Sequence, residues 1–259
     1  MVLIHLIPYQ VKAYGISDIG LVRQNNEDVW AQMPKDGFYI LADGMGGHQA
    51  GEVAAREMTN LLCRIVHKKI TPEKNSLSLS ELKELLTRAI RHVNLQVHKM
   101  SRSNTELHGM GTTLCCLLFY ENGLVIAHVG DSRIYRYRDQ KLHQLTRDHS
   151  LLSELLDQGQ LSEQQAAGFV YKNIITKAIG TESKVDPTVD HTEIQADDLY
   201  LMCSDGLSDL LSMGEIETIL ATTIDIPEAL KKMVACANER GGKDNITAVI
   251  TRVEQGSKT

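Results

Sequence analysis

The chain has 259 residues, of which 42% are hydrophobic and 23% charged, and it carries a formal net charge of -6 at pH 7. This composition is typical of a folded globular protein and excludes both a largely disordered chain and a helical membrane protein, which would need a window of roughly 18 apolar residues. The acidic balance, without any cluster of lysine and arginine, argues against nucleic acid as a partner, because phosphate backbones are bound by concentrated positive charge.

The first hundred residues are expected to contain two strands and two helices. Residues 11–17 and the apolar run 37–42 have strand character, and the second run leads into a glycine-rich loop expected over 43–47. From Gln49 onward, apolar residues recur at steps of three and four, which predicts a helix. A second helix is expected to begin at Ser80, in the segment SELKE, ahead of another apolar stripe.

The middle of the chain is expected to form a β-meander followed by a polar region. Three strands are expected over 112–120, 123–129 and 132–138, since very short turns separate them. A short helix over 151–158 precedes a polar, glutamine-rich region that reads as a surface subdomain up to Phe169.

The C-terminal part adds one strand, two helices and a closing strand. The strand is expected over 199–203, the helices over about 212–222 and 226–239, and the closing strand in the last part of GGKDNITAVITRV. No linker and no repeat of solenoid length interrupts the chain. One α+β domain is therefore the expected organisation.

The five cysteines are odd in number and show no C-x-x-C spacing. We expect buried free thiols of a reducing cytoplasm rather than disulfides or zinc ligands. The apolar N-terminus lacks the basic region and the cleavage site of a signal peptide, which also favours a cytoplasmic protein. The cysteines are Cys63, Cys115, Cys116, Cys203 and Cys236.

Acidic residues recur where expected strands meet turns. A single aspartate at such a place is usually a turn former or a cap. Several carboxylates gathered at one rim repel one another unless cations neutralise them, and hard oxygen ligands of this kind suit Mg²⁺ or Mn²⁺. The residues are Asp43, Asp131, Asp205 and Asp244, joined by the acidic pair Glu27 and Asp28.

Two glycines and one arginine accompany these carboxylates. Gly44 and Gly206 directly follow aspartates, where a glycine permits a tight turn and also lets a backbone carbonyl approach an ion. Arg23 stands four residues before Glu27. It is either an ordinary surface residue or a substrate clamp, because a guanidinium offers a fork that matches two phosphate oxygens.

Eight short motifs occur in an order that resembles the metal-dependent protein phosphatase family, type 2C, in its bacterial form. The resemblance covers roughly residues 13–253. Any one motif would be a weak signal, whereas their number, order and spacing make an accidental match very improbable. The motifs are RQNNED, LADGMGGHQAGE, GMGTTL, HVGDSRIY, LTRDHSLL, NIITKAIG, SDGLSDLL and GGKDNIT.

The resemblance implies a four-layer α-β-β-α sandwich of two antiparallel sheets flanked by helices, with a dinuclear Mg²⁺ or Mn²⁺ centre at one end. It implies a single phosphatase domain over 11–254, with a small flap subdomain at about 149–180. Residues 1–10 and 255–259 are then short terminal extensions.

The resemblance also implies a role for each acidic residue. Asp43 would bridge the two metals, Asp205 and Asp244 would hold the first, and Glu27 with the Gly44 carbonyl would hold the second. Asp28 would act through water or as an alternative ligand, and Asp131 with Asp205 would bind a third, weaker metal.

The remaining site residues are assigned in the same way. Arg23 matches the phosphate-binding arginine, and Ser204 and Asn245 adjoin ligands as orienting groups. In eukaryotic relatives a histidine directly follows the DG pair and is proposed as the general acid. Here that position is Met45, and His48, three residues later, is the candidate acid, with a structural hydrogen-bonding role as the alternative. Lys177 stands where an arginine is common.

The implied activity is that of a metal-dependent protein-serine/threonine phosphatase acting by attack of a metal-bridging hydroxide on phosphoserine or phosphothreonine. Expected partners are phosphorylated proteins, including a Ser/Thr kinase and its substrates, and a monomer is the default state. No cysteine lies in a phosphate-binding C-x5-R loop, and the G-K-[ST] end of a P-loop is missing. A catalytically silent phosphoprotein-binding pseudophosphatase and a small-molecule phosphoesterase remain as alternatives.

Overall fold

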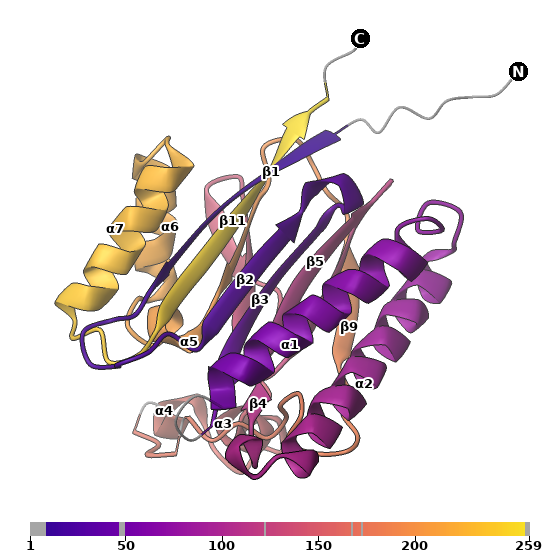
Figure 1. The fold of residues 1–259 in the computed structure, drawn as a ribbon. Coiled ribbons are helices and arrows are strands. Elements are labelled where there is room, and N and C mark those ends of the chain that lie inside the picture. The colour runs from indigo at the N-terminus through magenta and orange to yellow at the C-terminus, as the bar shows by residue number, and fades with distance from the viewer. Residues whose placement is uncertain (1–8, 47–49, 122, 167, 172, 257–259) are drawn as a thin grey trace, which may run out of the picture.

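Two antiparallel sheets face each other in the computed structural model, and helices cover the outer face of each sheet (Figure 1). The structure describes residues 9–46, 50–121, 123–166, 168–171 and 173–256. The order of layers, helices, sheet, sheet and helices, confirms the expected sandwich.

The first sheet contains both ends of the domain. Its strands, in the order in which they pair, are β1 (Tyr9–Asp18), β11 (Ile246–Gln255), β10 (Leu199–Cys203), β7 (Arg133–Arg138) and β8 (Lys141–Gln144). Strands β1 and β11 pair along their whole length, from Tyr9 opposite Gln255 to Asp18 opposite Ile246. The first strand therefore begins two residues before the expected start at Val11, because pairing with the C-terminal strand extends it.

The second sheet holds two of the three strands that were expected to form a meander. The third, β7, belongs to the first sheet, where it pairs with β10 and β8, so the three-strand meander was wrong. Its strands, in pairing order, are β2 (Asp28–Met33), β3 (Phe38–Met45), β5 (Leu114–Tyr120), β6 (Gly123–Val129) and β9 (Thr188–Thr192), with β4 (Gly111–Thr112) beside the end of β3. Short 3-10 turns precede β3 (Pro34–Asp36) and follow the second long helix (Thr105–Leu107).

The helices form two outer layers and one small group. The second sheet is covered by α1 (Ala50–Ile65), which ends in a π-helical turn (Val66–Ile70), and by α2 (Leu79–Ser103); the first is covered by α5 (Asp205–Ser208), α6 (Met213–Thr222) and α7 (Ile226–Glu239). Between β8 and β9 lie α3 (Leu151–Asp157) and α4 (Glu163–Ala166). None of the helices in the described ranges is long and apolar enough to cross a bilayer.

Strict alternation along the strands builds three apolar clusters. In β3, Phe38 and Ile40 face the helices α1 and α2, whereas Tyr39 and Leu41 face the other sheet. Successive side chains of a strand point to opposite faces, so one apolar strand can supply both layers. The layer between the sheets includes an edge-to-face contact between the rings of Tyr39 and Phe119, whose centroids are 5.8 Å apart. Packing on both faces makes the sheets a rigid support for the loops at their ends.

Three strands of the structure were missed by the periodicity of the sequence. Strand β8 has one buried side chain, Leu142, and β9 is an edge strand whose residues are mostly exposed. Strand β2 is only partly buried after its first residue, Asp28. Their positions follow from pairing with neighbouring strands rather than from their own hydrophobicity.

Two local boundaries also differ from expectation. The loop expected to begin at Asp43 begins later, because Asp43 pairs with Asp28 of β2 and Gly44 pairs with Thr112 of β4. The cap of α2 is Ser78 rather than Ser80: the Ser78 hydroxyl accepts from the Glu81 amide, and the Glu81 carboxylate accepts from the Ser78 amide in return. This capping box stabilises the helix start.

Candidate metal centre and active site

The predicted acidic residues meet at one end of the sandwich, and both sheets contribute them. In the second sheet, Asp28 opens β2 opposite Asp43 of β3, and Asp131 follows β6 by two residues. In the first sheet, Asp205 follows β10 and Asp244 precedes β11. Because the strands are antiparallel, the start of one and the end of its neighbour lie at the same edge. The facing of the two sheets then brings residues that are far apart in sequence into one cluster.

Asp43 is held from the backbone by a pair of threonines. Its carbonyl oxygen accepts from the amide of Thr113 at 2.8 Å and from the hydroxyl of Thr112 at 2.9 Å, and its own amide donates to the Thr113 hydroxyl at 2.9 Å. Ser132 lies 2.7 Å from the same hydroxyl and ties it to the loop that carries Asp131. The motif GMGTTL, to which the sequence alone assigned no role, therefore positions Asp43.

Glu27 and Gly44 lie side by side, as the expected second metal position requires. The Gly44 amide donates to the Glu27 carbonyl at 3.2 Å. A Cβ on Gly44 would lie 2.3 Å from the Gly51 carbonyl oxygen and 2.7 Å from that of Glu27, so only glycine fits this close approach. The carboxylate of Glu27 is buried against Gly51 at the start of α1, and burial raises its pKa.

Ser204 orients Asp28 across the gap between the sheets. Its hydroxyl donates to Asp28 Oδ2 at 2.8 Å and accepts from the Thr247 amide at 3.0 Å. Both side chains are buried. Since the hydroxyl is fixed by the backbone of β11, it holds one carboxylate oxygen and leaves the other, Asp28 Oδ1, without a hydrogen-bond partner.

Asn245 fixes the loop that carries Arg23. Its side-chain amide donates to the carbonyl oxygens of Ile19 at 3.0 Å and Asn25 at 2.9 Å, and its oxygen accepts from the Glu27 amide at 2.8 Å. One buried carboxamide thus holds both ends of the loop and the acidic residue that follows it. The orienting role expected for this residue corresponds to these contacts.

Replacing Asn245 by alanine is expected to weaken the binding of Mn²⁺ by about 10- to 100-fold, the usual effect of losing a group that orients metal ligands. The reason is that Glu27 loses its anchor. Calorimetric titration of the wild type and the variant with Mn²⁺ measures the difference. An unchanged Mn²⁺ affinity would contradict this role.

Burial and mutual repulsion raise the pKa of the clustered carboxyl groups. Burial is the largest cause for each, and it raises the pKa of Asp28 to about 7, of Asp131 to about 7 and of Asp205 to about 6. The pKa of Asp43 is shifted well above its ordinary value by burial and then by the negative charges of the other aspartates. Four ionised carboxylates cannot share this space at neutral pH without a compensating positive charge.

The donor set fits divalent cations that keep part of their water shell. Asp28 Oδ1 and Asp131 Oδ1 are buried oxygens without a hydrogen-bond partner, which a cation would satisfy. Within the described ranges, no three His, Cys, Asp or Glu side chains are already arranged to enclose one ion. Each ion would therefore take one or two carboxylates together with waters and a carbonyl oxygen, which is how Mg²⁺ is usually bound.

Arg23 forms an ion pair with one member of the cluster, Asp244. Its Nη2 donates to Asp244 Oδ2 at 2.7 Å, and both side chains are partly exposed. The hydrogen bond to Asp244 raises the pKa of the guanidinium. The sequence could not predict this pair, because 221 positions separate the partners. A guanidinium carries five N–H donors, so this ion pair does not use all of them.

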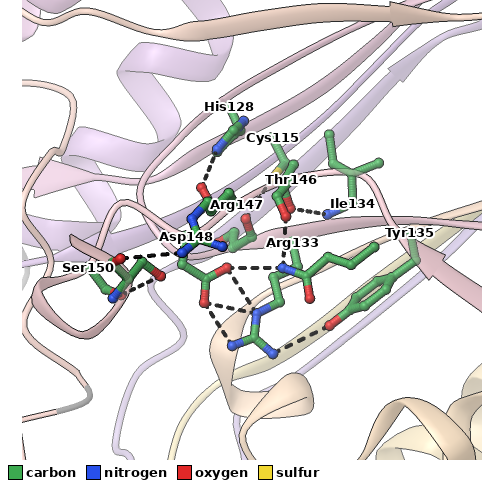
Figure 2. Close-up of polar contacts among 12 residues, drawn as sticks. Cys115, His128, Arg133, Ile134, Tyr135, Thr146, Arg147, Asp148 and Ser150 are labelled. Carbon is green, nitrogen blue, oxygen red and sulfur yellow. Dashed lines mark hydrogen bonds and ion pairs between the residues drawn. The ribbon is translucent and has the colours of Figure 1, made fainter. Parts of the chain in front are cut away.

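A cavity of about 440 Å³ opens beside Asp131 and Asp205. Figure 2 shows one of its walls, in which the Arg133 guanidinium holds both oxygens of Asp148, with Nε 3.0 Å from Oδ1 and Nη2 2.7 Å from Oδ2. The bidentate ion pair balances the negative charge of Asp148. The charge of Arg133 is therefore already used and does not balance the aspartates Asp131 and Asp205, which line the same cavity. His128 Nε2, 2.8 Å from the Arg147 carbonyl oxygen, ties the same segment to β6.

The remaining predicted residues are His48, Lys177 and the five cysteines. His48 falls outside the described residues, and Lys177 lies in the segment between α4 and β9, half-buried.

The cysteines are all free thiols as expected, but Cys63 and Cys236 are only partly buried. Burial raises the pKa of Cys63 to about 11 and of Cys203 to about 12, so neither is a thiolate nucleophile at neutral pH.

Comparison with known proteins places the chain among enzymes. The family model described as "Protein phosphatase 2C" matches residues 21–250. The chain is 38% identical over 237 residues to "Serine/threonine phosphatase stp" of Listeria innocua, covering 90% of this chain and 92% of the relative. The serine/threonine phosphatase structure of S. agalactiae superposes with a TM-score of 0.86 at 34% identity, covering 94% of this chain and 100% of that one. The catalytic domain of the phosphatase PstP "in complex with 2 Manganese ions" gives 0.81 at 34% identity, covering 95% and 100%.

Proposed function

Since this chain belongs to the protein phosphatase 2C family, we propose that its clustered carboxylates form the divalent-cation centre at which phosphoserine and phosphothreonine are hydrolysed. The protein is a metal-dependent serine/threonine protein phosphatase, and its substrates are phosphoproteins. The observation that carries the site assignment is Asp43, which lies within the electrostatic reach of aspartates from both sheets.

The proposed ligand set is the one that the family resemblance implies. Asp43 would bridge two ions, Asp205 and Asp244 would complete one position, and Glu27 with the Gly44 carbonyl the other. Such ions supply an activated water at neutral pH and stabilise the charge that develops on the phosphoryl oxygens. Asp28 and Asp131 have unpartnered oxygens that support a water-mediated role and a third, weaker position respectively.

The protein's own groups place the substrate and the ligands. Arg23 would direct its free donors at the phosphate while its contact with Asp244 fixes the side chain. Ser204 and Asn245 hold Asp28 and the loop in place. His48 is the proposed general acid for the leaving group. The segment 149–180 is proposed as the flap subdomain of a single domain over 11–254.

The cellular setting is proposed from composition and relatives. The free cysteines support a reducing cytoplasm. A Ser/Thr kinase acting on the same proteins would supply the phosphorylated substrates. A monomer and use of either Mg²⁺ or Mn²⁺ complete the proposal. The comparisons give no support to a silent pseudophosphatase.

The purified chain is expected to hydrolyse p-nitrophenyl phosphate and a phosphothreonine peptide when Mn²⁺ or Mg²⁺ is present, and to lose both activities in EDTA. Nucleotides at the same concentration serve as the comparison and should be poor substrates. Inactivity of the wild type with either cation, or a preference for nucleotides over phosphopeptides, would overturn the proposal.

A further inference from the structure

Two groups of exposed apolar side chains flank the acidic cluster. The first, the loop edge, consists of Leu21 and Val22, which are 67% and 64% exposed in the loop after β1. The second, the flap edge, consists of Val170, Tyr171 and Ile174, which are 85%, 60% and 46% exposed in the segment between α4 and β9. Large apolar side chains exposed in groups mark interaction sites more often than single ones do.

The loop edge is held rigidly. The Leu21 amide donates to the Gly242 carbonyl at 2.7 Å, and Asn245 fixes both ends of the loop. Gly20, with φ +78, packs so closely that a Cβ there would lie 2.2 Å from the Asp244 carbonyl oxygen. Leu21 and Val22 are therefore presented to solvent by a fixed backbone and not by a loose turn.

The flap edge is anchored in a similar way. The Ile174 carbonyl accepts from the Leu151 amide at 2.8 Å, and an antiparallel bridge joins Ser150 to Ile175. The ring of Tyr171 packs edge-to-face on Phe169, with centroids 5.9 Å apart. This contact orients the exposed ring and reduces the entropy that it would lose on binding a partner.

Both edges adjoin a cavity at the proposed catalytic centre. This cavity, of about 250 Å³, is lined by Asn173, next to Ile174 in sequence, and by Lys243 and Asp244, next to Gly242. Figure 1 shows the loop after β1 and the segment with α3 and α4 at the same end of the sandwich. Val22 is the residue before Arg23, which is hydrogen-bonded to Asp244. The apolar loop edge therefore lies directly next to the arginine that is proposed to bind the phosphate.

We propose that these edges select substrates in which large aliphatic or aromatic side chains lie on both sides of the phosphorylated serine or threonine. The inference rests on the proposed function and adds the chemistry of the flanking residues. An extended segment advances about 3.3 Å per residue, so side chains two or three residues from the phosphate lie roughly 7–10 Å from it, and the inference assigns these side chains to the edges. Burying such a side chain against an exposed leucine or valine removes apolar surface from water on both partners.

The phosphoprotein segment is favoured over other occupants because the surface is continuous with the reacting centre. A phosphate at Arg23 would bring the neighbouring residues of its own chain close to Val22, the residue before Arg23, and to the cavity that Asp244 and Asn173 line together. A second copy of this chain would have to cover the same opening and would block substrates. Self-association is therefore an alternative that the experiment must separate.

The test compares two phosphothreonine peptides of equal length and charge, with leucine or with serine at the second position on either side of phosphothreonine. In the wild type, kcat/KM for the leucine peptide is expected to exceed that for the serine peptide by about tenfold, the usual discrimination of an apolar contact. In the double variant Leu21→Ser/Val22→Ser, and separately in Val170→Ser, this ratio should fall to within about threefold of unity. The ratio divides out any general effect of a substitution on turnover.

The matched control is Ile224→Ser, which removes a side chain that is 95% exposed between α6 and α7 and should leave the ratio unchanged. A wild-type ratio near one, or a ratio that survives in both edge variants, overturns the inference while p-nitrophenyl phosphate turnover still upholds the proposed function. If the wild type hydrolyses neither the peptides nor p-nitrophenyl phosphate, both the inference and the proposed function are overturned. Sedimentation velocity adds a last outcome: dimers that dissociate in the double variant, with no change of ratio, assign the surface to self-association instead.

Discussion

Replacing Asp43 by asparagine is expected to lower kcat for p-nitrophenyl phosphate by at least about 10³-fold at saturating Mn²⁺, because the proposed bridging carboxylate is lost and the amide cannot carry its charge. The folded structure should survive. Asparagine is isosteric, and the backbone of residue 43 keeps its bonds to Thr112 and Thr113. Steady-state kinetics and a thermal melt in EDTA measure the two effects.

Asp139→Asn is the charge-matched control for this experiment. Asp139 is exposed in the turn between β7 and β8, at a positive φ of 51 that asparagine also tolerates. It should keep wild-type kinetics. Activity of the Asp43 variant within about tenfold of wild type would contradict the bridging role, since one hydrogen-bonding group in such a site is worth more than that.

The second large effect concerns stability without divalent cations. In EDTA, Asp131→Asn is expected to stabilise the protein, by roughly 2 kcal/mol more at pH 8 than at pH 5. The pKa of Asp131 is raised from 3.8 to about 7 in the folded protein, with burial as the main cause. A carboxyl group whose pKa is raised on folding does not change the free energy of unfolding below pH 3.8. It lowers this free energy progressively as the pH rises through 7, and by the full amount above that. Urea unfolding at both pH values, with and without Mn²⁺, measures the difference.

Added Mn²⁺ should reduce the advantage of the Asp131 variant at pH 8, because cations at the neighbouring carboxylates replace repulsion by attraction. Asp139→Asn again provides the control and should show no such pH dependence. Equal stabilisation at pH 5 and pH 8, or destabilisation at pH 8, would show that Asp131 does not carry an unfavourable charge.

Apolar patterning predicted a mixed α+β domain but not all of its strands, whereas the layered sandwich was implied by the family resemblance. Strand β3 has an unbroken apolar run, and it was found; β9, with its exposed edge, was not. The periodicity of a sequence reports how much each segment buries, whereas an edge strand is held mainly by bonds to a neighbour. The same limit misplaced the end of β3, since Asp43 remains in the strand only because Asp28 and Thr112 pair around it.

The residue types of the candidate site were predictable, and their contacts were not. Carboxylates at strand ends pointed to a cation site before any fold was considered. The ion pair of Arg23 with Asp244, the hold of Asn245 on Ile19 and Asn25, and the exposure of Leu21 depend on how loops pack in three dimensions. Loop packing leaves no periodic signal in a sequence.

The division of the carboxylates between the two sheets links catalysis to the cohesion of the sandwich. An ion shared by Asp43 and Asp205 would act as a noncovalent cross-link between layers that also meet through apolar contacts such as Phe119 of β5 on Tyr200 of β10. Cation binding and the packing of the layers are then thermodynamically coupled, so each strengthens the other by the same free energy. A substitution that weakens the packing between the sheets would thus also lower the affinity for the cation, even where the substituted side chain is buried well away from the cation.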